Sequence, residues 1–152
     1  MGHNMKEKME HNIQEDVVSS AVIFIQNSLK ALEERAKKTS KLLVLPIAKK
    51  EFQTLKISLP RRLGNTTVAL KLLELLENSI LISNTQDSVN NIKQCHEEIF
   101  EKCGKNIFTR YTLKKVRRKK YFCVIVDEAS YLEDSVLEKI YGINSKYFIL
   151  VG

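Results

Sequence analysis

The sequence has few glycines and prolines, few cysteines, and no apolar run long enough to span a membrane. Its 5 glycines and 2 prolines leave no low-complexity linker, and no internal repeat is visible. The N-terminus lacks the apolar stretch of a signal peptide. The 3 cysteines are odd in number and fall in helix-like or strand-like patterns. We therefore expect reduced thiols in a cytoplasmic protein without a membrane segment.

The composition fits one globular domain with an anionic partner. Hydrophobic residues make up 43% of the chain and charged residues 28%, which is ordinary for a globular protein. A length of 152 residues suffices for a buried core. The net charge of +7 favours an anionic partner without identifying it.

Apolar periodicity divides the chain into three parts. We expect a flexible tail over residues 1–14, then a helix and connector over residues 15–52, then a core over residues 53–152. The helix places apolar residues on one face at helical spacing, namely Val18, Val22, Ile25, Leu29 and Leu32. Lys41–Pro46 reads as a short extended piece.

Within the core, apolar strand patterns alternate with helical ones. Strands are expected near 55–59, 79–84, 106–109, 121–126 and 147–152, and helices near 68–76, 88–103 and 131–141. This alternation predicts an α/β fold with a mostly parallel sheet of about five strands between helices.

The first functional candidate is the polar stretch between the strand at 55–59 and the next helix. Gly64 would let a backbone approach phosphate, the following helix start offers amides to an anion, and the Thr66 hydroxyl suits Mg²⁺. Two positions depart from the phosphate-loop pattern, because Leu59 replaces the first glycine and Asn65 replaces the lysine. The alternative is a plain strand-to-helix turn with a threonine cap.

The second candidate is the apolar run 121–126, which ends in Asp127 and Glu128. Such a run is typical of a strand buried on both faces of a parallel sheet, whose carboxyl end is where α/β proteins bind ligands. Asp127 would belong to a Mg²⁺ shell and Glu128 would polarise water. The alternative is a junction capped by Asp127. Both motifs occur in the order that a P-loop protein requires, which favours the phosphate-binding interpretation. We then expect the two strands that precede the motifs to lie centrally in the sheet.

These motifs carry a family resemblance. Residues 60–67 resemble the "S-R-Q-L-G-K-T-T" loop of phage terminase large subunits, the DNA-packaging ATPases, which also carry an arginine where Arg61 stands. Residues 127–130, Asp-Glu-Ala-Ser, resemble the Walker B motif of terminases and helicases. The resemblance covers about residues 53–152, after which we expect no second RecA-like half.

The resemblance implies a P-loop NTPase-like three-layer sandwich that uses ATP and Mg²⁺. It implies phosphate binding by Leu63, Gly64, Asn65, Thr66 and Thr67, and Mg²⁺ binding through Thr66 and Asp127. It assigns water activation to Glu128, while Arg61 or Arg62 would supply the charge that Asn65 lacks. It also implies DNA packaging, in the host cytoplasm if the protein is viral, as a homo-oligomer or in a larger motor assembly.

A dense basic run precedes the strand at 121–126. Seven positive charges and no acid fall between residues 110 and 120, and the candidate nucleic-acid contacts are Lys114, Lys115, Arg117, Arg118, Lys119 and Lys120. Such residues contact phosphate backbones without reading sequence. The alternative is a solvated loop.

The sequence therefore predicts an ATP-binding, DNA-associated P-loop ATPase. The alternative is a catalytically degenerate P-loop scaffold that binds nucleic acid or a protein without turnover. Asn65 favours the scaffold, whereas the retained pair Asp127 and Glu128 favours the enzyme.

Overall fold

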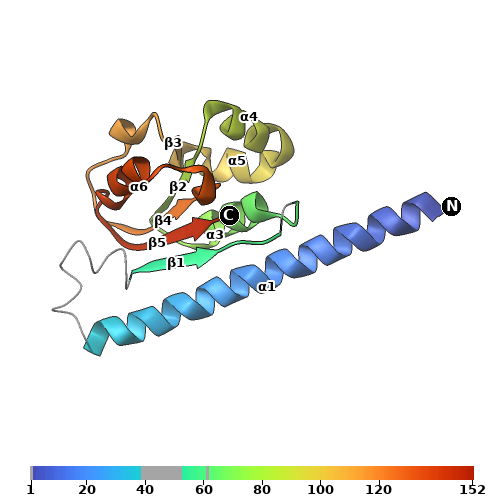
Figure 1. Ribbon diagram of the computed structural model, residues 1–152, viewed down its shortest axis with the longest axis horizontal. Coiled ribbons are helices and arrows are strands. Elements are labelled where there is room, and N and C mark those ends of the chain that lie inside the picture. Colours follow the sequence, from blue (N-terminus) through green and yellow to red (C-terminus); the bar gives the residue numbers. More distant parts are fainter. Residues whose placement is uncertain (1, 39–52, 61) are drawn as a thin grey trace.

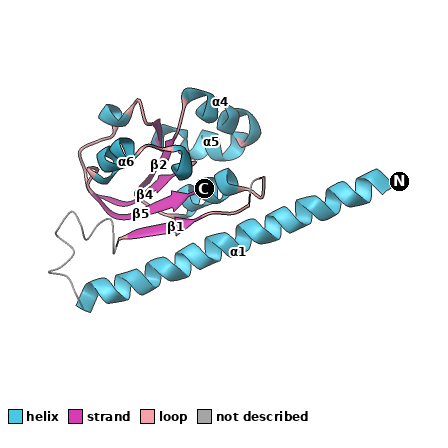
Figure 2. Cartoon of the chain, viewed as in Figure 1, coloured by secondary structure: helices cyan, strands magenta, loops and turns pink. Residues whose placement is uncertain are grey.

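The protein is built on a five-stranded, all-parallel sheet, which confirms the expected α/β fold (Figures 1 and 2). The computed structural model describes residues 2–38, 53–60 and 62–152, and it describes α1 side chains over residues 13–35. The strands are β1 (Thr54–Ile57), β2 (Ser79–Ser83), β3 (Ile107–Thr109), β4 (Tyr121–Val126) and β5 (Ser145–Val151). They lie in the order β1-β5-β4-β2-β3. Because all pairs are parallel, every carboxyl end lies at one edge of the sheet.

Helices cover both faces of the sheet. They are α1 (Gly2–Lys38), α3 (Asn65–Leu75), α4 (Gln86–Cys95), α5 (Glu97–Cys103) and α6 (Asp134–Tyr141), with the 3-10 turns η1 (Gly104–Asn106), η2 (Leu113–Lys115) and η3 (Ala129–Tyr131). Alternate strand residues point to opposite faces. One set packs with α1 and α3, and the other packs with α6 and its neighbouring loops. The result is a three-layer arrangement compatible with a P-loop-like sandwich.

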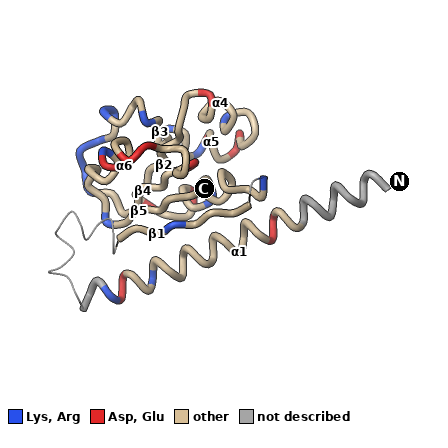
Figure 3. The backbone as a smooth tube through the Cα atoms, viewed as in Figure 1, with Lys and Arg blue, Asp and Glu red and all other residues tan. Residues whose placement is uncertain are grey.

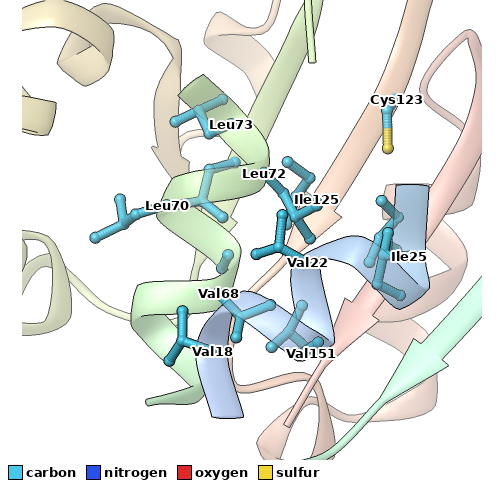
Figure 4. Packing of buried hydrophobic residues seen from close by; sticks show 14 of the residues in the cluster. Val18, Val22, Ile25, Val68, Leu70, Leu72, Leu73, Cys123, Ile125 and Val151 are labelled. Atoms are coloured by element: carbon cyan, nitrogen blue, oxygen red, sulfur yellow. The ribbon is translucent and has the colours of Figure 1, made fainter. Parts of the chain in front are cut away.

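Helix α1 packs along α3 through the apolar face that the sequence predicts (Figure 4). Val18, Val22, Ile25 and Leu29 are buried, and Leu32 is partly buried. Each such side chain contributes about 1.5–3 kcal/mol relative to exposure. Lys146 Nζ also lies 2.6 Å from Glu33 Oε1, which joins the start of β5 to the carboxyl half of α1.

Helix α1 begins at Gly2, so residues 2–14 are helical, whereas the sequence predicts that this helix begins at residue 15. This stretch contains no proline, and several of its residues are lysine, glutamate and methionine, which favour helix. A helix nucleated by the packed part of α1 therefore extends without an apolar period of its own. The extended piece expected at Lys41–Pro46 lies outside the described residues.

The sequence also predicts that both motif-bearing strands are central, and for β1 this is wrong. β4 is the middle strand, but β1 lies at one edge of the sheet because β5 pairs between them. Apolar patterning gives strand positions but not their lateral order.

Among the described helices, none combines the length and apolar character of a membrane span.

The helix expected at 88–103 is two helices, α4 and α5, which meet at His96. His96 has φ −132° and ψ 53°, outside the helical region, so the chain bends there. The three cysteines differ in exposure. Cys123 is buried, Cys103 is half-buried and Cys95 is exposed.

Candidate functional site

An open hollow of about 510 Å³ lies at the carboxyl edge of the sheet, where both candidate motifs meet. Its size falls within the range of small-molecule sites. The chain after β1 contributes Leu59, Arg62, Gly64 and Thr66, and the chain after β4 contributes Asp127 and Glu128. The end of β5 contributes Gly152, and α1 contributes Gln14. The fold thus brings together the residues that the sequence singles out after β1 and β4.

Gly64 sets the turn from the β1 loop into α3. Its φ of 103° lies in the left-handed region, which a side chain disfavours. A Cβ at this position would also lie 2.7 Å from Val18 Cγ2, because α1 packs directly against the turn. No side chain caps α3, so the threonine-cap alternative is not supported. The first amides of α3 therefore remain available to an anion.

A hydrogen bond joins the two motifs. Thr66 Oγ1 donates to Asp127 Oδ2 over 2.9 Å, although the residues lie 61 positions apart. The other oxygen, Asp127 Oδ1, accepts the Glu128 amide at 3.0 Å, so the carboxylate also caps its own turn. Asp127 is only 1% exposed. Burial raises the pKa of this carboxyl to about 6, the bond from Thr66 opposes the rise, and the Glu128 charge adds to it.

Glu128 occupies a strained position on the wall of the hollow. Its φ of 54° is left-handed, which is uncommon for a residue with a side chain. The turn is held because the Glu128 carbonyl accepts the Tyr131 amide at 3.0 Å, and the Gly152 carbonyl accepts the Ser130 amide at 2.7 Å. Backbone strain held in this way is characteristic of functional sites.

The Asn65 side chain forms hydrogen bonds with Leu59, near the start of the loop. Its Oδ1 accepts the Leu59 amide at 2.8 Å, and its Nδ2 donates to the Leu59 carbonyl at 3.1 Å. Both polar atoms of the carboxamide are thus bonded to one backbone unit. The residue in the lysine position therefore fixes the end of β1 to the start of α3, while its own amide lies in the first turn of α3.

Arg62 is the positively charged residue that the described chain places on the wall of this hollow. It is exposed and has a left-handed φ of 69°. Arg61 lies outside the described residues. Leu63 and Thr67, which the resemblance groups with the phosphate-binding residues, do not line the hollow.

Several wall residues escape sequence reasoning. Gln14 comes from a helix far upstream, and no local pattern connects it with the loop. Ser58 and Ser130 are short polar residues next to the motifs. Tyr131 is 69% exposed and lies on the wall. An aromatic residue close behind Asp127 and Glu128 was the available signal for it.

The donor atoms suit Mg²⁺ accompanied by phosphate. Thr66 and Asp127 offer a hydroxyl and a carboxylate, and Mg²⁺ in phosphate-transfer sites commonly takes one or two carboxylates, with substrate phosphates and water completing its shell. The described residues contain no group of three or more histidine, cysteine, aspartate or glutamate side chains able to hold a metal by themselves. Thr66 and Asp127 could therefore supply two of the ligands of a Mg²⁺ ion whose shell is completed by phosphate and water.

The six candidate nucleic-acid residues lie away from this hollow. They are all exposed and sit on the chain between β3 and β4. Three of them, Lys115, Arg117 and Lys119, line a second hollow at the opposite edge of the sheet.

Comparisons of the chain with protein-family models, with curated proteins and with solved structures give no match.

Proposed function

We propose that the protein is an ATP-binding, nucleic-acid-associated P-loop ATPase similar to the motor core of terminases and helicases. The supporting observation is the Thr66–Asp127 hydrogen bond, placed at an uncapped helix start beside a left-handed glycine. A plain strand-to-helix turn gives no reason for a buried carboxylate with a raised pKa at that point.

The residues of the two motifs have specific roles in this proposal. The amides of Gly64, Asn65 and Thr66 bind phosphate oxygens at the positive end of α3. Arg62 supplies the charge that a loop lysine would otherwise bring, since Asn65 is bonded to Leu59. Thr66 and Asp127 hold Mg²⁺, which neutralises charge on the phosphates when bound.

Glu128 orients the attacking water and accepts its proton. It follows Asp127 directly and lines the same hollow, so one turn presents both carboxylates to a bound nucleotide. A positioned base of this kind accelerates a reaction about 10²–10⁴-fold. Tyr131, exposed on the wall, offers a π face against which a base can stack.

The second candidate function is a catalytically degenerate P-loop scaffold that binds nucleic acid or a protein partner without turnover. The observation in its favour is the bonding of Asn65, which leaves no lysine on the described wall of the hollow. Loss of that point charge removes stabilisation where negative charge gathers during phosphoryl transfer. Turnover is therefore the property that separates the scaffold from the enzyme.

Binding and hydrolysis measured separately, with and without DNA, distinguish these functions. Asp127→Ala should weaken Mg²⁺-dependent nucleotide binding. Glu128→Gln should keep binding within about twofold while lowering turnover at least about 100-fold. Equal turnover in wild type and Glu128→Gln would sink the catalytic assignment. Nucleotide binding without turnover in the wild type would favour the scaffold.

A further inference from the structure

A second hollow, of about 540 Å³, lies where strands β2, β3 and β4 begin. Its walls come from the carboxyl end of α3, the turn into β2, the start of β3 and the chain preceding β4. Because the strands are parallel, this hollow lies at the sheet edge opposite the nucleotide site.

Positive charge predominates in this hollow. Its cationic lining residues are Lys105, Lys115, Arg117 and Lys119, all exposed. Among the described residues, none of these four forms a salt bridge, whereas the wall residue Glu74 is paired with Lys102 at 3.7 Å. Glu77 is the other carboxylate on the wall. In Figure 3, blue marks Lys and Arg positions along the segment that precedes β4.

The basic segment is folded against the domain. Leu113 and Val116 pack on the core, so the lysines and arginines between and after them face outward. Asn78 fixes the segment to the α3–β2 turn, because its Nδ2 donates to the Lys120 carbonyl at 2.9 Å and its carbonyl accepts the Phe122 amide at 2.9 Å. The cations are therefore displayed on an ordered scaffold, which lowers the entropic cost of binding.

We propose that this hollow binds the phosphate backbone of a single-stranded nucleic acid. Phe108 contributes a half-buried aromatic ring to the wall, whereas Tyr121 is only 4% exposed and has Lys119 Nζ 5.0 Å from its ring centre. A positively charged groove with an accessible aromatic side chain, here Phe108, is the combination that single-strand binders use. The inference rests on the nucleic-acid part of the proposed function and is independent of ATP turnover.

The segment supplies its own matched control. Lys115, Arg117 and Lys119 line the hollow, while the intervening Lys114, Arg118 and Lys120 do not. The two sets carry equal charge on the same stretch of chain, and every member is exposed. A site in the hollow depends on the first set, whereas diffuse attraction depends on both sets equally.

The test compares two triple variants of the full chain, each with one set changed to glutamine. Binding of a labelled oligothymidylate is followed by fluorescence anisotropy without nucleotide, between about 50 and 200 mM salt. Changing Lys115, Arg117 and Lys119 should weaken binding tenfold or more and reduce the salt slope by about 2, at about 0.7 per lost phosphate contact. Changing the other set should weaken binding about threefold or less. Equal losses would overturn the inference.

Additional binding measurements distinguish the possible ligands and binding sites. Oligouridylate and duplex DNA probes distinguish RNA and duplex binding, and tighter binding of the duplex than of either single strand would contradict the proposal. Saturating Mg²⁺·ATP should not displace the oligonucleotide, because the two hollows lie at opposite edges, and competitive displacement would place the strand in the nucleotide site. No binding of any probe by the wild type would overturn the nucleic-acid part of the proposed function as well, while nucleotide binding is measured independently. Circular dichroism confirms that both variants fold, and Arg117→Gln alone repeats the test with the smallest change.

Discussion

Replacing Asn65 with alanine tests the loop clamp, which is the two hydrogen bonds between the Asn65 side chain and Leu59. The change removes the acceptor of the Leu59 amide at 2.8 Å and the donor to its carbonyl at 3.1 Å. Each bond contributes about 1 kcal/mol net, so the variant should lose about 2 kcal/mol of unfolding free energy. For a chain of this size the melting temperature should fall by about 4–8 °C.

Thermal and urea unfolding, followed by circular dichroism, measure this loss. The matched control is Asn91→Ala, which makes the same substitution at an exposed site in α4. The control corrects for helix propensity and should change stability by less than about 0.5 kcal/mol. If the two variants unfold alike, the two hydrogen bonds from Asn65 to Leu59 do not stabilise the loop.

Asn65→Lys separates stability from phosphate binding. Lysine removes the same two bonds, so its stability should fall as in Asn65→Ala. It also brings a point charge to the loop, and charge-assisted hydrogen bonds are about twice as strong as neutral ones. We therefore expect Asn65→Lys to be less stable than wild type but to bind Mg²⁺·ATP more tightly in calorimetry. Weaker binding by this variant than by Asn65→Ala would exclude phosphate from this turn.

Two further predictions concern residues at the same edge. Gly64→Ala should destabilise the protein by about 1–3 kcal/mol and weaken nucleotide binding. The reason is that the new Cβ would lie 2.7 Å from Val18 Cγ2, at a residue whose φ of 103° disfavours a side chain. Urea unfolding that matches wild type would contradict the close approach of α1. Asp127→Asn should stabilise the metal-free protein at pH 7 by on the order of 2 kcal/mol. The folded pKa of Asp127, about 6, exceeds its ordinary 3.8. Between pH 3.8 and about 6 the unfolded chain has released the Asp127 proton while the folded chain retains it, so wild-type stability falls as the pH rises through this range. The asparagine variant has no such proton and lacks this loss. The melting-temperature difference should therefore grow between pH 4 and pH 7, and a constant difference would contradict the raised pKa.

Local patterns predicted the elements well where periodicity alone determines them. The helical spacing of Val18, Val22, Ile25 and Leu29 identified the buried face of α1, and the apolar run 121–126 identified a strand buried in the sheet. The three-layer α/β class follows from that alternation of strands and helices. Where the pattern carries no signal, as at His96 and residues 2–14, the expected helices differ from those observed.

The assembly of the candidate site was only partly accessible from sequence. The motifs identified Thr66 and Asp127, but their hydrogen bond depends on β4 and α3 becoming neighbours. The contribution of Gln14 depends on how α1 crosses the loop, and the edge position of β1 depends on where β5 inserts. These are long-range packing outcomes, which a local window of residues does not encode.

The division of the basic run into two sets was likewise invisible in the sequence. Lys115 and Lys114 are chemically identical neighbours, and only the folded backbone places one of them on the second hollow. The same holds for Asn65, whose side-chain partner Leu59 lies just upstream but is met only because the loop turns back.

Calorimetric titration of Mg²⁺·ATP into wild type and Thr66→Val is a direct test of a nucleotide site at Thr66 and Asp127. Valine keeps the shape of threonine but removes the hydroxyl that donates to Asp127 at 2.9 Å. We expect Mg²⁺-dependent binding by the wild type and a loss of about tenfold or more in the variant, because the variant lacks the hydroxyl that the proposal assigns to Mg²⁺ and one interaction with a charged partner is worth about 1.5–3 kcal/mol. Absent binding by the wild type, or equal binding by both proteins, would contradict this expectation.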